Sequence, residues 1–115
     1  MADVVIHELE PIPTSPDDAF YSQRTVLDGT PYIFTFRLNQ RENTYFLDVE
    51  LDDGTVLASG VKIVCNVPLL ERLVHDLRPK KTIIALAGGD DTSPPGLGDL
   101  GDGRRVQLYY GDLGV

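Results

Sequence analysis

The middle of the chain alternates between strongly apolar positions and mostly polar ones. In residues 32–38, and again in residues 45–51, every second residue is large and apolar; these residues are Tyr32, Phe34, Phe36, Leu38, Tyr45, Leu47, Val49 and Leu51. Successive side chains of a β-strand point to opposite faces. This period of two therefore predicts two strands, each with one apolar face.

Further strands are expected on both sides of these two. Residues 24–27, 57–63 and 106–110 carry similar short patterns, and a short apolar run at 4–6 suits a first strand. In residues 81–87 apolar side chains fall on both parities, which predicts a strand buried on both faces.

The connections between these strands are short. Asp28-Gly29 and residues 52–54 (Asp-Asp-Gly) are hairpin signals, and residues 39–43 form a polar turn. Short connections make neighbouring strands antiparallel. The pattern predicts a mainly β fold, an antiparallel meander that forms a small barrel or sandwich.

One short α-helix is expected at about residues 67–77. Asn66 suits its N-cap, Pro68 its first turn and Pro79 its end. Between them, apolar residues recur at helical spacing, at Leu69, Leu70, Leu73, Val74 and Leu77.

Composition divides the chain into three parts. Residues 1–22 are predicted to hold the first strand and a proline-rich arm, because Pro11, Pro13 and Pro16 remove backbone donors. A plain connector between strands is the alternative for this segment. Residues 23–110 form one β-rich domain, and residues 111–115 form a flexible tail.

A glycine- and aspartate-rich stretch at residues 88–103 buries little and is predicted to be a surface loop. It contains Gly-Leu-Gly-Asp-Leu-Gly at 96–101, a literal match to the dinucleotide pattern. That pattern needs a preceding strand and a following helix. A loop continues here instead, so nucleotide binding is not expected.

Four carboxylates in this loop raise the question of calcium; they are Asp90, Asp91, Asp99 and Asp102. The EF-hand spacing and its closing glutamate are absent. A solvated acidic loop without a metal is the expectation, and calcium is kept as the alternative.

The charge balance excludes other classes of partner. Lys and Arg number 10 and Asp and Glu 18, which gives a net charge of -8. Nucleic acid and anionic membrane surfaces both require basic patches. The single thiol, Cys65, is expected to be a small buried hydrophobe rather than a nucleophile paired with His7 or His75.

Asp48 and Glu50 lie two positions apart on one strand and share a face, as a catalytic carboxylate pair would. That face is more simply the wet face of the sheet. Arg37 or Lys62 is expected to pair with them across the strands.

Exposed apolar residues in such a fold mark contacts with other proteins. Phe46 and Tyr109 are predicted on wet faces, and the proline-rich segment is expected to order on binding. The predicted partner-binding residues are Pro11, Pro13, Pro16, Phe20, Phe46 and Tyr109.

Three segments, in the same order, resemble a family of short proteins of contractile-tailed phages. They are residues 26–48, which begin Val-Leu-Asp-Gly-Thr-Pro-Tyr, residues 60–70 (Gly-Val-Lys-Ile-Val-Cys-Asn-Val-Pro-Leu-Leu) and residues 94–110. One member of this family is described as the plug of a cyanophage baseplate.

The resemblance implies a structural, non-catalytic plug or adaptor in a phage tail baseplate that contacts hub or tail proteins. It implies a place in the virion after assembly in the bacterial host cytoplasm, and no cofactor, nucleic acid, membrane or small-molecule substrate. Two other readings stay open: a ligand-binding module for calcium or a carbohydrate, and a small hydrolase that uses the carboxylate pair.

Overall fold

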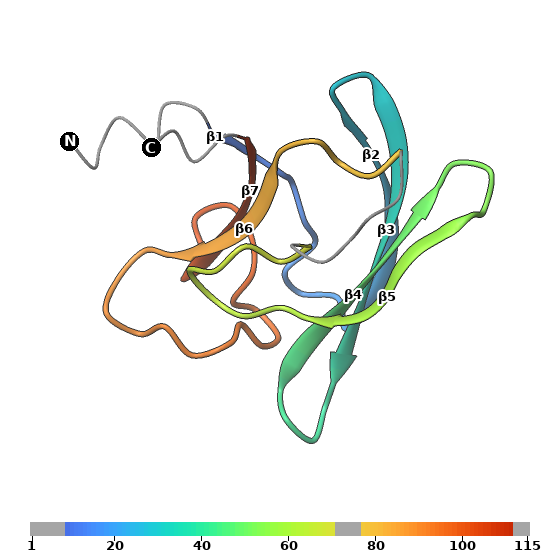
Figure 1. Cartoon of the computed structure of the whole chain (residues 1–115). Helices are drawn as coiled ribbons and strands as arrows, with labels where there is room; N and C mark the ends of the chain where they lie inside the picture. Colours follow the sequence, from blue (N-terminus) through green and yellow to red (C-terminus); the bar gives the residue numbers. More distant parts are fainter. Residues whose placement is uncertain (1–8, 71–76, 112–115) are drawn as a thin grey trace.

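The computed structural model describes residues 9–70 and 77–111. Within them seven strands form two antiparallel sheets (Figure 1). One sheet has the order β1-β7-β6 and the other the order β2-β3-β4-β5. The strands are β1 (Leu9–Pro11), β2 (Phe20–Leu27), β3 (Thr30–Asn39), β4 (Thr44–Leu51), β5 (Val56–Lys62), β6 (Thr82–Ala87) and β7 (Val106–Gly111).

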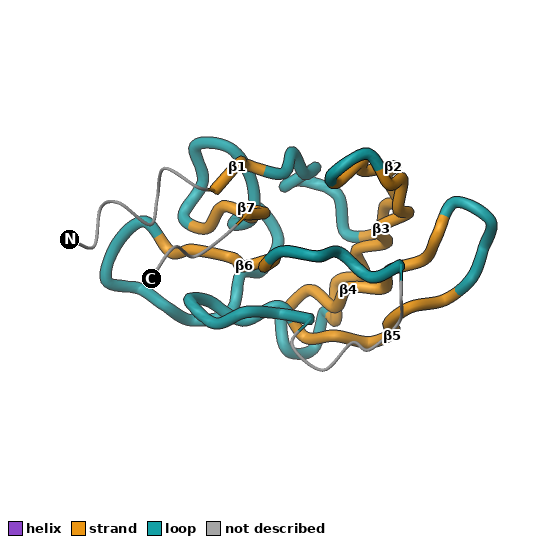
Figure 2. The backbone as a smooth tube through the Cα atoms, turned by 45° about the horizontal axis from the view of Figure 1, so that its top comes forward, coloured by secondary structure: helices purple, strands orange, loops and turns teal. Residues whose placement is uncertain are grey.

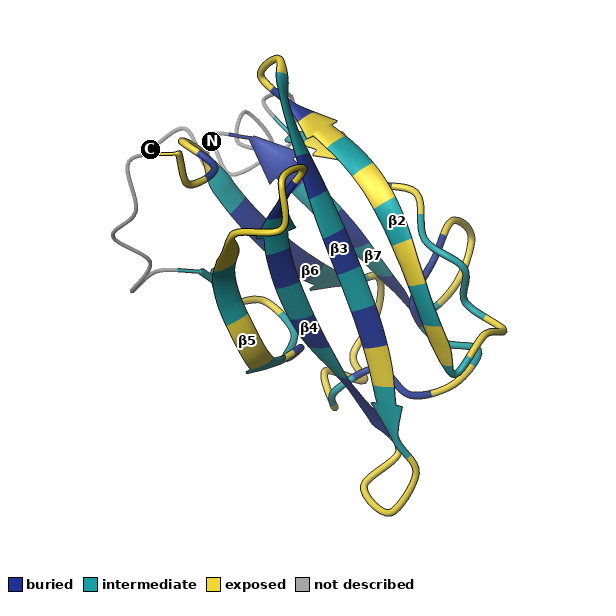
Figure 3. Cartoon of the chain, turned by 90° about the vertical axis from the view of Figure 1, so that its right-hand side faces the viewer, coloured by how far each residue is buried: buried dark blue, intermediate teal, exposed yellow. Residues whose placement is uncertain are grey.

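The two sheets face each other as a sandwich, with the four-stranded sheet in front in Figure 3 and β6 and β7 behind it. The core lies between them and includes all of the predicted alternate residues except Leu38, which is half-buried. Phe34, Phe36, Tyr45, Leu47 and Val49 are fully buried, and Leu108 and Val106 face them from β7. The sandwich, one of the two predicted forms, is therefore the observed fold.

The hairpin between β2 and β3 turns at Asp28 and Gly29, which have φ angles of 52° and 81°. Two consecutive positive φ values are the geometry of a tight two-residue hairpin, as the Asp-Gly signal predicts. The turn sets Leu27 opposite Thr30, and the register continues without a shift from there to Phe20 and Arg37.

The predicted helix at 67–77 is wrong for the residues that can be compared. None of the described residues is helical (Figure 2), and residues 71–76 lie outside them. Asn66 has a φ of 66°, its N–H donates to the Ala85 carbonyl and its side chain accepts from the Ala87 N–H. Pro68 bridges Ile84, so this segment lies along the edge of β6 and its backbone is committed to strand pairing.

The strand predicted at residues 81–87 is confirmed as β6. Its burial on both faces is explained by residues 65–69, which lie along its edge. Ile83, Ile84 and Ala85 are all buried. Side chains on both faces of β6 are therefore buried, although β6 is an outer strand of its sheet.

The proline-rich segment packs against the rest of the molecule. Leu9–Pro11 pairs with β7, and the Ile12 side chain is 2% exposed within the core. The Ile12 N–H donates to the Leu108 carbonyl and the Thr14 hydroxyl to the Leu100 carbonyl. The predicted first strand at 4–6 lies outside the described residues, as does most of the predicted tail, and Gly111 ends β7.

Candidate partner-binding surfaces

The outer face of the four-stranded sheet carries a row of alternating aromatic and basic residues. The register sets Phe20 opposite Arg37, Arg37 opposite Phe46 and Phe46 opposite Lys62. Phe20 is 70% exposed and Phe46 is half-buried. Arg37 and Phe46 also line a surface hollow of about 320 Å³. We call these four residues the aromatic row.

A bidentate ion pair with Asp48 orients Arg37 within this row. The Arg37 guanidinium donates to both carboxylate oxygens of Asp48 at 3.0 Å, which confirms the expected cross-strand pair. Lys62 instead pairs with Glu42 at 3.3 Å.

Asp48 also shapes the neighbouring strand. Its carboxylate accepts from the Gly60 N–H at 2.8 Å and the Ser59 hydroxyl at 3.3 Å, where β5 departs from regular register. Burial acts to raise the pKa of Asp48, but the hydrogen bonds from Arg37, Gly60 and Ser59 outweigh it and lower the pKa. A carboxylate held ionised in this way anchors a strand and is a poor general acid.

The opposite face of the sandwich presents Tyr109. Its Cα partners are Pro11 on β1 and Ile84 on β6. Tyr109 lines a hollow of about 370 Å³ together with Arg104 and Arg105, among others. The predicted contact residues thus fall into two groups on opposite faces, joined by the segment that carries Pro13 and Pro16.

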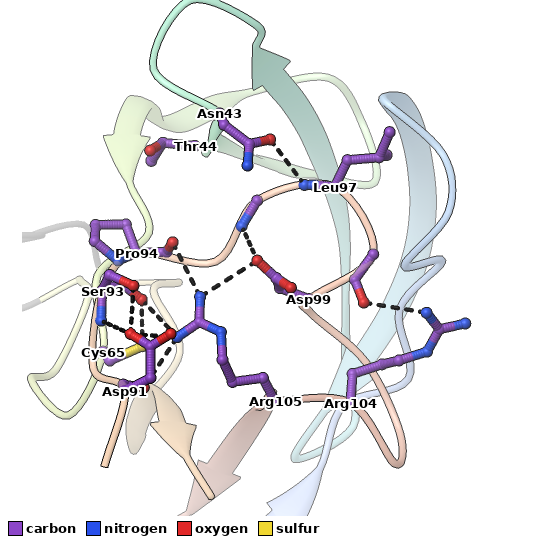
Figure 4. Close-up of polar contacts among 12 residues, drawn as sticks. Asn43, Thr44, Cys65, Asp91, Ser93, Pro94, Leu97, Asp99, Arg104 and Arg105 are labelled. Atoms are coloured by element: carbon purple, nitrogen blue, oxygen red, sulfur yellow. Dashed lines mark hydrogen bonds and ion pairs between the residues drawn. The ribbon is translucent and has the colours of Figure 1, made fainter. Parts of the chain in front are cut away.

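The loop at residues 88–103 is pinned from below by Arg105 (Figure 4). The Arg105 guanidinium donates to the carbonyls of Asp91 (2.9 Å), Ser93 (3.0 Å) and Pro94 (3.2 Å), and to the Asp99 carboxylate (3.3 Å). Three of these four acceptors are backbone atoms. No periodicity or motif in the sequence marks Arg105; the one signal is the basic pair Arg104-Arg105 directly after an acidic loop.

Further contacts hold the loop at the neighbouring residues Leu97 and Gly98. Arg104 pairs with Asp17 at 3.1 Å and donates to the Gly98 carbonyl. On the other side, the Asn43 side chain accepts from the Leu97 N–H at 3.2 Å. The loop is therefore bound to the β1–β2 connection and to the β3–β4 turn. The expectation that it buries little is wrong for Pro95 and Leu100, which are fully buried, and Leu100 belongs to the core.

The glycine pattern in this loop has a packing explanation. A Cβ on Gly96 would overlap the Asn43 side chain, and one on Gly101 would lie 2.9 Å from Pro16. Gly98 has a φ of 86°. The residues after the pattern form turns and not a helix, so the geometry for holding a pyrophosphate is absent from this described loop.

Two of the four acidic residues of the loop, Asp91 and Asp99, stabilise the loop itself. Asp91 accepts from the Ser93 hydroxyl and N–H, which lower its pKa, and lies 3.5 Å from Arg105. Asp99 accepts from the Gly96 N–H and Arg105. Asp90 and Asp102 are exposed. In residues 9–70 and 77–111, no three His, Cys, Asp or Glu side chains gather as a metal site would require.

Cys65 lies half-buried beneath the loop, where its thiol is 3.4 Å from the Ser93 carbonyl. Burial raises the pKa of the Cys65 thiol, which lowers its reactivity as a nucleophile. His7 and His75, the predicted candidates for pairing with it, lie outside the described residues.

Comparison with known proteins settles the family. The model of the family described as "Cyanophage baseplate Pam3 plug gp18" matches residues 9–113. This chain belongs to that family. It is a β-rich structural protein of a phage tail baseplate. No curated protein matches the chain.

The family match spans both candidate contact faces and the loop at residues 88–103. The aromatic row, Tyr109 and Arg105 all fall within residues 9–113.

Among the residues that the structure describes, no helix is long and apolar enough to cross a membrane.

Proposed function

We propose that this protein is a non-catalytic plug or adaptor that bridges hub or other tail proteins of the baseplate. The observation that carries the proposal is the family match over residues 9–113. By this proposal the protein resides in the virion after assembly in the host cytoplasm, and acts without cofactor, nucleic acid, membrane or small-molecule substrate.

The two contact faces support a bridging role. A bridge needs two separate surfaces, and the aromatic row and Tyr109 lie on opposite sides of a packed sandwich. Aromatic and arginine residues are the types that contribute most at protein interfaces. Phe46 and Arg37 line one hollow, and Tyr109 and Arg104 line another, so each face provides that combination.

The alternatives have less support. The carboxylates of Asp91 and Asp99 already interact with Arg105 and with backbone amides, so they are poorly placed to coordinate calcium. Asp48 is committed to Arg37, which disfavours a hydrolase built on the Asp48 and Glu50 pair.

The test replaces the chromosomal gene of the phage with variants and quantifies this chain in purified tails by mass spectrometry. Phe46→Ser and Tyr109→Ser should each lower incorporation at least tenfold, since the loss of one interface anchor exceeds about 1.4 kcal/mol. Val56→Ser, at a 58% exposed apolar residue of β5, is the matched control and should incorporate normally. Absence of the chain from wild-type tails would refute the proposal, as would normal incorporation of both variants.

A further inference from the structure

The sandwich has four outer strands, and three of them are protected against pairing with another chain. An unprotected edge exposes N–H and C=O groups that recruit further strands. β1 has only three residues and ends in Pro11. Residues 65–69 cover β6 through bridges to Ala85 and Ile84. β5 is broken by register shifts and contains Gly60 at a positive φ.

The fourth outer strand, β2, has none of these protections. It runs for eight residues, Phe-Tyr-Ser-Gln-Arg-Thr-Val-Leu, without proline, glycine or a register shift. Beside it lies an open groove of about 370 Å³ between β2 and residues 10–13.

The register shows which backbone groups of β2 are free. Leu27 and Thr30 flank a two-residue hairpin turn and therefore form a hydrogen-bonded pair, and such pairs alternate along an antiparallel ladder. The backbone groups of Ser22, Arg24 and Val26 consequently point away from β3. Over the described residues, no backbone hydrogen bond from another segment reaches them.

The sequence of β2 complements itself about Gln23. When a second β2 runs antiparallel with Gln23 opposite Gln23, Phe20 lies opposite Val26 of the second copy and Ser22 opposite Arg24. Phe20 and Val26 are 70% and 51% exposed, the two large exposed apolar residues of this strand. In this register Phe20 and Val26 cover each other on both sides of the axis. Phe20 has the same parity as Ser22, Arg24 and Val26, so all four residues form hydrogen-bonded pairs with the second copy.

We infer that the free protein forms a symmetric dimer in which β2 pairs antiparallel with β2 of a second copy about an axis through Gln23. The two four-stranded sheets join into one continuous eight-stranded sheet, and the exposed edge disappears. A C2 interface requires one surface to fit itself, which this register satisfies.

Charge repulsion between the two chains opposes the dimer, so the effect of salt on dimer formation is diagnostic. Each chain carries a net charge of -8, and this register sets Asp18 near Asp28 of the second copy. Salt screens such repulsion. Sodium chloride should therefore strengthen the dimer, whereas it would weaken the docking of a basic peptide on the same edge.

The first test measures self-association by sedimentation equilibrium up to a few hundred micromolar. The wild type should show a reversible monomer–dimer equilibrium that shifts toward dimer with added salt. Val26→Lys should weaken it at least tenfold, and Val56→Lys, the same change on the far strand β5, should leave it within about twofold. A monomeric wild type at every concentration, or equal effects of the two variants, would overturn the inference.

A cross-linking test checks the register independently. In a Cys65→Ala background, Gln23→Cys places two thiols opposite each other at a Cα separation of about 4.5 Å, within the range of a disulfide. Ser22→Cys places them on a diagonal of about 7–8 Å, beyond that range. Oxidation should yield a covalent dimer from Gln23→Cys only; a dimer from neither variant, or from Ser22→Cys alone, contradicts this register. Both tests concern the isolated protein, so their result is independent of baseplate incorporation.

Discussion

At the scale of single residues, buried tyrosines tie the loops to the core by their hydroxyl groups. The Tyr45 hydroxyl donates to the Asp18 carbonyl at 2.6 Å, the Tyr32 hydroxyl to the Leu77 carbonyl at 2.7 Å, and the Tyr110 hydroxyl to the Asp28 carboxylate at 2.6 Å. Each aromatic ring thus packs in the core, while its hydroxyl group donates a hydrogen bond to a residue in a connection between strands.

These tyrosines make the fold sensitive to alkali. Burial, with the nearby Tyr21 and Asp18, raises the pKa of Tyr45 from 10.0 to about 12. The unfolded chain therefore loses this proton first, so the stabilisation is complete below pH 10 and is lost as the pH rises toward 12. Tyr45→Phe should cost about 1 kcal/mol at pH 8, from the lost hydrogen bond. Urea unfolding at pH 8 and pH 11 should show a smaller loss of stability in Tyr45→Phe than in the wild type; equal losses would refute the role of Tyr45.

Gly96 is a residue-scale requirement for docking the loop. Gly96→Ala should push the Asn43 side chain away and cost about 1 kcal/mol, because the hydrogen bond that the Leu97 N–H donates to the Asn43 side chain is lost. Gly89→Ala, where a Cβ meets nothing within 4 Å, is the matched control and should be close to neutral.

A double-mutant cycle isolates this contact. In an Asn43→Ala background the overlap is gone, so Gly96→Ala should there cost much less than in the wild type. Thermal unfolding of the four proteins measures the coupling, and strictly additive effects would show that the Asn43 contact is not the cause.

At the scale of elements, strands were predictable where side chains alone decide the structure. The alternation in β3 and β4 and the Asp28-Gly29 turn specify local geometry, so the prediction held. Asn66, Pro68 and Leu69 failed as a helix start because their backbone pairs with β6, and that tertiary competition leaves no local trace. Arg105 was missed for a related reason, since its acceptors are mostly carbonyls, which every residue has.

Arg105 should control the order of the loop as an element. Arg105→Lys keeps the charge but loses the planar set of donors that holds four acceptors together. The loop above Cys65 should then open more often, and the thiol should react faster with a disulfide reagent. We expect a rate increase of about tenfold, for a loss of roughly 1.4 kcal/mol of local stability. Arg24→Lys, at the exposed pair with Asp52 on the other sheet, is the control and should react at close to the wild-type rate; equal acceleration in both variants would argue against the assignment.

At the scale of the whole molecule, the segment between β1 and β2 joins the two sheets. Leu9–Pro11 belongs to the sheet of β6 and β7, Ile12 lies in the core, and the Gln23 side chain of β2 donates to the Pro13 carbonyl at 2.7 Å. The sequence marked this segment only by its prolines, because a single buried isoleucine among them has no periodicity to reveal it. If the protein bridges two partners as proposed, load passes between its two faces, and this segment is one of the covalent connections between the two sheets.

The integrity of the sandwich should therefore depend on Ile12. Ile12→Ala leaves a cavity between the sheets and should destabilise the whole fold by about 2–5 kcal/mol, in one cooperative transition seen alike by circular dichroism and tyrosine fluorescence. Pro13→Ala, one residue on and exposed, keeps its carbonyl and should cost at most about 1 kcal/mol through the freer unfolded chain. If residues 11–16 acted instead as a detachable arm, both variants would melt like the wild type. Under the proposed baseplate role, Ile12→Ala should also lower incorporation into tails at temperatures where the isolated variant begins to unfold, because the unfolded chain presents no contact surface.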